Sequence, residues 1–189
     1  SAPSFTPKYS QDQINAAGDG TDWYSEVTRN GQIQQHNLSF TGGSDKTNFM
    51  VSFNYFGQDG IVKNSGLDRY SGRINLESEI SKIFKFGTNL TVSLVNNSNV
   101  PLGDRQFENS GVVNAAIQYD PRLPVKDAQG NYSLQVGAEP NPVSLLEITD
   151  ITAQKRILAT TWIQANITKG LNIKLNVGID NQIGKRSNY

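Results

Sequence analysis

Apolar and polar residues alternate with a period of two along most of this chain. In the segment 48–56 the apolar members of the alternation are Phe49, Val51, Phe53 and Tyr55. The positions between them are mostly asparagine and serine. This alternation indicates a β-strand with one apolar and one polar face.

The same period recurs in five further segments, near residues 38–41, 70–80, 84–94, 156–168 and 171–180. Short connections at 42–46, 81–82 and 169–170 alternate with long ones at 57–68 and 97–150. Consecutive strands joined by tight turns pair in antiparallel fashion. The sequence therefore predicts an all-β fold, an antiparallel meander of about six strands.

We expect four regions along the chain. Residues 1–31 form a loop with short helices, the first capped by Ser10 with Gln13 at the capping-box position; these pieces look too short and too polar to carry a core. Residues 32–96 hold four strands and 151–189 two more. Between them, 97–150 is a long loop with a short helix at residues 110–119, and a loop of this length is usually functional.

The strands and their connections favour a membrane barrel. Several strands span roughly eleven residues, the length that a tilted strand needs to cross the hydrocarbon layer. Short turns at one end and long loops at the other are typical of outer-membrane barrels. A soluble β-sandwich or a lipid-binding barrel has the same alternation, but strand length, the charged polar face and the loop asymmetry favour a segment of a large transmembrane β-barrel.

Composition narrows the possible functions further. The chain has 189 residues, 36% hydrophobic, and a mean hydropathy of −0.48, as expected where only half of each strand meets lipid. Seventeen basic residues balance seventeen acidic ones, so the chain has no excess of positive charge that would indicate binding to nucleic acid. Cysteine is absent and His36 is the only histidine, so the sequence predicts no catalytic, cofactor or metal site.

Several stretches resemble the SusC/RagA family of TonB-linked outer-membrane transporters, in the family's order. The matching stretches are TDWYSEV at 21–27, QHNLSFTGGSDKTN at 35–48, VSFNYFGQDGIVKNSG at 51–66, DRYSGRINL at 68–76, KFGTNL at 85–90, PRLPV at 121–125 with GNY at 130–132, NPVSLLE at 141–147 and KGLNIKLNVG at 169–178.

The resemblance implies a function within a larger protein. Members of the family carry an N-terminal plug inside a barrel of about 22 strands. They import oligosaccharides or peptides with a SusD-like surface lipoprotein and are driven through TonB. The chain is then expected to begin after the plug and the first barrel strand, to end several strands into the barrel, and to contact outer-membrane lipid. The 97–150 loop would be extracellular, where it could contact substrate or the lipoprotein.

The resemblance also gives the polar parity of the strands a place, the barrel lumen. There its amides and hydroxyls could hydrogen-bond sugars or peptides, although solvating the lumen or holding the plug is the commoner role. The residues expected to face the lumen are Ser52, Asn54, Arg73, Asn75, Glu77, Asn89, Thr91, Gln164, Asn166, Lys174 and Asn176. The alternative function is a soluble secreted or periplasmic β-sheet module that binds glycans.

Overall fold

The computed structural model describes residues 7, 9–101, 111–137 and 140–189. Residues 102–110 and 138–139 of the predicted 97–150 loop, and most of residues 1–8, lie outside the described part. The chain divides into two compact units: Ser1–Arg29 with Val100–Ile148, and Asn30–Asn99 with Thr149–Tyr189. We call them the helical unit and the sheet unit.

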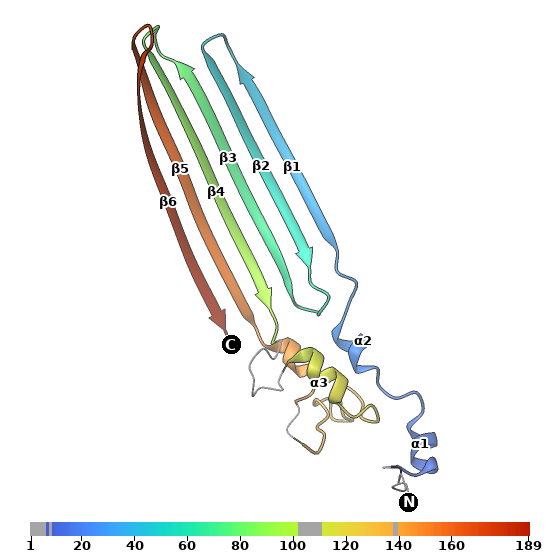
Figure 1. Ribbon diagram of the computed structural model, residues 1–189. Coiled ribbons are helices and arrows are strands. Elements are labelled where there is room, and N and C mark those ends of the chain that lie inside the picture. The colour runs from blue at the N-terminus through green and yellow to red at the C-terminus, as the bar shows by residue number, and fades with distance from the viewer. Residues whose placement is uncertain (1–6, 8, 102–110, 138–139) are drawn as a thin grey trace, which may run out of the picture. The chain divides into compact units, whose positions relative to one another are not determined.

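The sheet unit contains one antiparallel sheet whose six strands follow one another in chain order (Figure 1). Each strand therefore pairs with its neighbours in sequence, which confirms the predicted meander. The strands are β1 (Ile33–Gly43), β2 (Thr47–Asp59), β3 (Gly66–Glu79), β4 (Phe84–Asn99), β5 (Asp150–Thr168) and β6 (Leu171–Asn188).

The strands run further toward the long connections than the alternation indicates. β4 continues to Asn99 rather than ending near residue 94, and β5 begins at Asp150 rather than near residue 156. On the apolar face the alternation is interrupted by Asn96 on β4 and by Lys155 on β5, so an apolar period does not extend to these added residues. Backbone pairing and a two-pronged ion pair between Asp150 and Arg186, with oxygens and nitrogens 2.5–2.8 Å apart, hold them instead.

The helical unit is built from short helices. They are α1 (Gln11–Ala17), α2 (Trp23–Val27), α3 (Val112–Gln118) and a 3₁₀ helix, η1 (Ser144–Glu147). The predicted capping box is present, because the Gln13 N–H donates to Ser10 Oγ and the Ser10 N–H donates to Gln13 Oε1. Among the described residues, no helix combines the length and the apolar character needed to cross a membrane.

The first thirty residues do contribute to a core, contrary to the expectation that they are too polar. Trp23 and Val27 are buried, and the Trp23 ring packs edge-on against Tyr119 with 4.7 Å between ring centroids. The indole Nε1–H donates to the carbonyl oxygen of Asp120 at 3.0 Å. The contact joins residues about a hundred positions apart, so no local pattern of residues could predict it.

A buried asparagine organises the rest of the helical unit. Asn141 is 1% exposed, and its Nδ2 donates to the carbonyl oxygens of Val125 and Ser133 at 3.2 and 3.1 Å. Its Oδ1 accepts from the Val143 N–H at 3.0 Å. A buried amide with these partners is satisfied. The predicted long loop is therefore a packed structure in its described part, with side-chain contacts that fix its path.

Candidate functional site

The register of the sheet places the predicted lumenal residues on one face. Residues directly opposite each other in an antiparallel pair point to the same side. Ser52 lies opposite Arg73, which lies opposite Thr91. The same register carries this face through Asn54, Asn75, Glu77 and Asn89 on to Gln164, Asn166, Lys174 and Asn176. All eleven residues share this polar face, and its place at a lumen remains a prediction.

Amide groups connect neighbouring strands across the polar face. Asn54 Nδ2 donates to Asn37 Oδ1 on β1, and Asn54 Oδ1 accepts from Ser71 Oγ on β3 at 3.5 Å. Further along, Gln164 Nε2 donates to Asn166 Oδ1 at 2.9 Å. Amides that already pair with one another can still accept and donate further bonds, because each carries two acceptor and two donor sites. The face can therefore bind polar groups without losing its own network.

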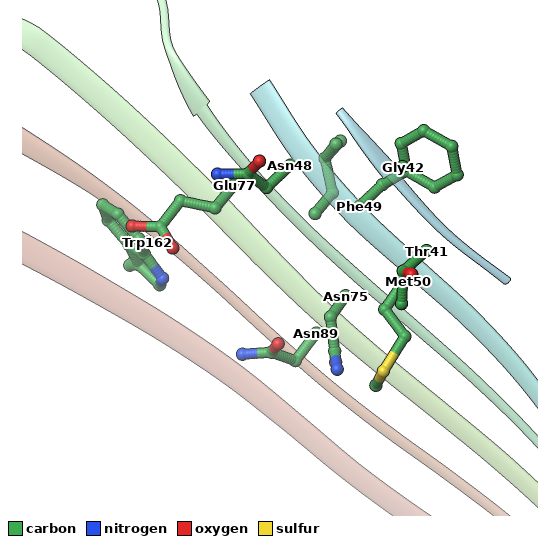
Figure 2. Close-up of a pocket in the computed structure, with 10 residues that line it drawn as sticks. Thr41, Gly42, Asn48, Phe49, Met50, Asn75, Glu77, Asn89 and Trp162 are labelled. Carbon is green, nitrogen blue, oxygen red and sulfur yellow. The ribbon is translucent and has the colours of Figure 1, made fainter. Parts of the chain in front are cut away.

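A concavity on this face lies toward the tight-turn end of the sheet (Figure 2). Its polar-face lining comes from five neighbouring strands and combines three amides, a carboxylate and an indole: Thr41, Asn48, Met50, Asn75, Glu77, Asn89 and Trp162. Figure 2 shows Asn75, Glu77, Asn89 and Trp162 on the same side of the strands. Aromatic surface beside amide and carboxylate groups suits a polar chain such as a saccharide or a peptide.

Trp162 shapes this concavity, and the sequence analysis missed it. The residue lies on the polar parity of β5, opposite Gly87 on β4, and its ring occupies the space that a Gly87 side chain would fill. The ammonium group of Lys174 lies 4.0 Å from the centre of the indole ring. An isolated large aromatic within a polar parity, next to a strand carrying glycine, is the signal that could have revealed it.

The opposite face of the sheet carries an exposed apolar band. Large side chains on this face are exposed to solvent, for example Phe53 with 56% and Leu175 with 62% of its surface exposed. On β4 the band runs from Phe84 to Leu94. Ten steps of about 3.4 Å, tilted by about 36°, give a height of about 27 Å, close to the band of about 25 Å in transmembrane barrels.

The band is staggered from strand to strand, which gives the tilt. On β2 the band ends at Tyr55. The residue of β6 that lies in the same row of paired residues as Tyr55 is Ile183. On β6 the uninterrupted apolar alternation already ends at Ile179. A shift of four residues, about 14 Å, over four strand spacings, about 19 Å, corresponds to a tilt of about 36°. Transmembrane barrels tilt their strands by about 35–45°.

Aromatic rings mark the end of the band toward the long connections. His36, Tyr55 and Tyr70 lie in one row, with centroid distances of 6.0 Å and 5.0 Å between successive rings. The Tyr55 hydroxyl donates to Asp68 Oδ1 at 2.8 Å. Rings with one apolar and one polar end favour the boundary between lipid and water. The only histidine of the chain thus lies in an aromatic row.

No group of three or more His, Cys, Asp or Glu residues within the described ranges could hold a metal ion. In the helical unit, hydrogen bonds from Ser25 lower the pKa of Asp22, and a hydrogen bond to Glu147 raises the pKa of Tyr132. These groups cap a helix and tie a loop, and they do not converge on a common point.

Comparison with known proteins gives relatives for almost the whole chain. TonB-dependent receptor P3 of Formosa agariphila is 30% identical over 190 residues, which cover 96% of this chain and 19% of that protein. TonB-dependent receptor SusC of Bacteroides thetaiotaomicron is 28% identical over 62% of this chain and 11% of its own length. No family model matches.

Solved structures agree with these relatives. The RagAB peptide importer in its closed-closed state superposes with a TM-score of 0.72 and 25% identity, covering 90% of this chain and 20% of that one. Its open-open state gives a TM-score of 0.73 at 24% identity. The chain therefore spans about a fifth of the length of the first of the curated relatives and of these structures.

Proposed function

We propose that this chain, a barrel segment of a SusC/RagA-like TonB-dependent transporter, forms part of the wall through which a nutrient crosses the outer membrane. SusC and RagA are outer-membrane proteins, in agreement with the location predicted from the sequence. The chain supplies about a fifth of such a protein, so import is an activity of the whole assembly.

One observation carries the proposal: the sheet has an exposed apolar band on one face and an amide-rich face on the other. The band has the height and the stagger that tilted strands need in a membrane. The polar face would then line the lumen, with the eleven residues named above as its described contribution. A soluble glycan-binding sheet would leave the apolar face exposed to water at a cost of about 25 cal/mol for each Å².

The substrate follows from the polar face. Its asparagines, glutamine and hydroxyls suit neutral polar chains, and the RagAB relatives are described as peptide importers. We therefore assign oligosaccharides or peptides as the substrate class. A SusD-like surface lipoprotein would act beside the helical unit, which contains most of the connection between β4 and β5. TonB would act through a part of the protein outside this chain.

Catalysis is not part of the proposal. The relatives are named receptors and importers. The carboxylates of the polar face are separated or paired: Asp180 accepts from both Nε and Nη2 of Arg156, at 2.9 and 2.6 Å. Such a pair orders the face and offers no free general base.

The test is uptake by cells that lack the gene encoding this chain. We expect the deletion to abolish growth on, and accumulation of, either labelled oligosaccharides or labelled peptides, and the plasmid-borne gene to restore them. Fractionation should recover the protein in the outer membrane. A protein recovered in the soluble fraction, with normal uptake of both substrate classes in the deletion strain, would refute the importer and favour the soluble glycan-binding module.

The lumenal assignment needs a separate variant. Asn75→Leu with Asn89→Leu removes two amides from the concavity and leaves the backbone pairing between these two residues intact. We expect normal membrane insertion and an uptake KM raised by roughly tenfold, since two hydrogen bonds of about 0.5–1.5 kcal/mol are lost. Ser187→Leu on the opposite face serves as the control and should leave uptake unchanged.

A further inference from the structure

Three hydrogen-bond donors surround one alanine on the apolar-band face of the sheet. Ala153 of β5 lies opposite Asn96 on β4 and Lys185 on β6. Lys155 is two residues from Ala153 on the same strand, so it projects to the same side. Diagonal neighbours across strands are about 7–8 Å apart. The two ammonium groups and the amide can therefore converge on one small anion above the Ala153 methyl group.

The three side chains are available for such an anion. The side chains of Asn96, Lys155 and Lys185 make no hydrogen bond or ion pair with any residue that the structure describes. Both lysines are exposed. On this face β4, β5 and β6 carry no acidic residue between Phe84 and Asn99 or between Asp150 and Asn188. The nearest carboxylate, Asp68 opposite Asn96, already accepts from Tyr55.

Arginines of the same strands show the contrast. Arg156 and Arg186 alternate with the two lysines and project to the polar face, where each forms a two-pronged ion pair with an aspartate. On β5 and β6 the two arginines of the polar face are thus paired with aspartates, whereas the two lysines of the apolar-band face form no ion pair with the described residues. A pair of unneutralised lysines costs little at a water surface, but it serves no packing role there.

The position of the donors indicates the ligand. Lys155 comes two residues before Ile157, where the apolar band on β5 ends, and Lys185 lies beyond the end of the band on β6. Lysines at such a boundary keep their stems along the apolar surface and place their charge among lipid headgroups. This end of the sheet is opposite the tight turns, so in a barrel it meets the outer leaflet.

We propose that Asn96, Lys155 and Lys185 bind a phosphate group of an outer-leaflet lipid and hold that lipid against the barrel wall. The inference rests on the proposed function only in requiring that the apolar band lies in lipid. It adds a lipid-binding site that the import of a nutrient does not require. The two lysines supply the charge, and the Asn96 amide fixes the orientation of the headgroup.

The experiment measures lipid retention by the intact protein that carries this chain. The protein, in neutral detergent, is titrated with diphosphoryl lipid A and with the same lipid after dephosphorylation, and bound lipid is counted by native mass spectrometry. We expect Lys155→Gln or Lys185→Gln to weaken binding of the phosphorylated lipid about fivefold, and both together about twenty-five-fold. Binding of the dephosphorylated lipid should be equal in all variants.

Lys169→Gln is the matched control, since Lys169 lies in the tight turn of the same hairpin at the opposite end of the strands. It should bind both lipids as the parent protein does. Parent-like retention of phosphorylated lipid by the double variant would overturn the inference, as would full displacement of the lipid by inorganic phosphate at equal concentration. If the parent protein is soluble without detergent and binds neither lipid, the proposed function itself fails.

Discussion

The indole ring of Trp162 lies across the backbone of Gly87, the residue directly opposite it on the neighbouring strand. A methyl group on Gly87 would overlap the ring, whose atoms already occupy that space. The glycine thus permits a large aromatic side chain to lie flat on a face that is otherwise amide-rich. The floor of the concavity depends on this pair.

Gly87→Ala should therefore displace the indole ring and destabilise the sheet. Forcing a methyl group into an occupied site typically costs about 1–3 kcal/mol. Urea unfolding of the protein in detergent micelles, followed by tryptophan fluorescence, measures the change. Gly178→Ala is the control on the same face, because a Cβ there would meet its nearest atom, the Ala159 carbonyl oxygen, at an ordinary 3.7 Å. Equal stabilities of the two variants would show that the ring moves aside freely.

Adjacent residues of β4 test which face of the sheet meets lipid. Leu90 lies near the middle of the apolar band, and Asn89 lies on the polar face. We expect Leu90→Lys to lower the free energy of unfolding by about 2–4 kcal/mol, the cost of a lysine near the bilayer midplane. Asn89→Lys should change it by less than about 1 kcal/mol. Folding into lipid vesicles over a urea series gives both values, and a reversed order would exchange the two faces.

The buried Asn141 predicts a local effect in the helical unit. Asn141→Ala removes the three hydrogen bonds of a buried amide and should cost about 2–3 kcal/mol, although the carbonyls of Val125 and Ser133 keep the Ser133 N–H and the Tyr119 hydroxyl as donors. Limited proteolysis of the intact protein should then cut within residues 111–137 at lower protease concentration. Asn131→Ala removes an exposed amide that makes no hydrogen bond with the described residues. This variant should be cut at the same protease concentration as the parent protein. Unchanged cleavage of both variants would contradict the assigned role.

The cap of α2 predicts a dependence on pH. Asp22 accepts from Ser25 Oγ at 2.6 Å and from the Ser25 N–H at 3.1 Å, and these bonds lower its pKa below the ordinary 3.8. A lowered pKa means that the cap stabilises the helix fully above pH 3.8 and is lost as the pH falls through the lowered value. Hydrogen exchange in residues 23–28, corrected for the intrinsic rate, should rise over that range. Asp22→Asn, which caps without ionising, should show no such rise.

The sheet could be predicted because its physics is local. Phe49 and Ser52 already differ in parity, and the tight turns force their strands to pair with the next in sequence. The strand ends near Asn99 and Asp150 could not be predicted in this way, since Asn96 and Lys155 interrupt the apolar alternation before those ends. The contact between Trp23 and Tyr119 was also missed, because it depends on packing between distant segments.

The candidate site divides along the same line. Membership of the polar face follows from parity, so the eleven residues could be grouped from the sequence. The concavity could not, since it depends on the absence of a side chain at Gly87 and on the ring that fills that space. Likewise, only the register reveals that Asn96 and Lys185 flank the same alanine.

The stagger of the apolar band has a geometric consequence for any closed wall of which this sheet is a part. A displacement of about one residue for each strand means that the shear number grows in step with the strand number, and the tilt then stays near 36° at any circumference. Hairpins that keep this offset could be added or removed without changing the tilt of the strands already present. The width of the pore would then depend on the number of strands, whereas the tilt of the strands is determined by the offset between each neighbouring pair.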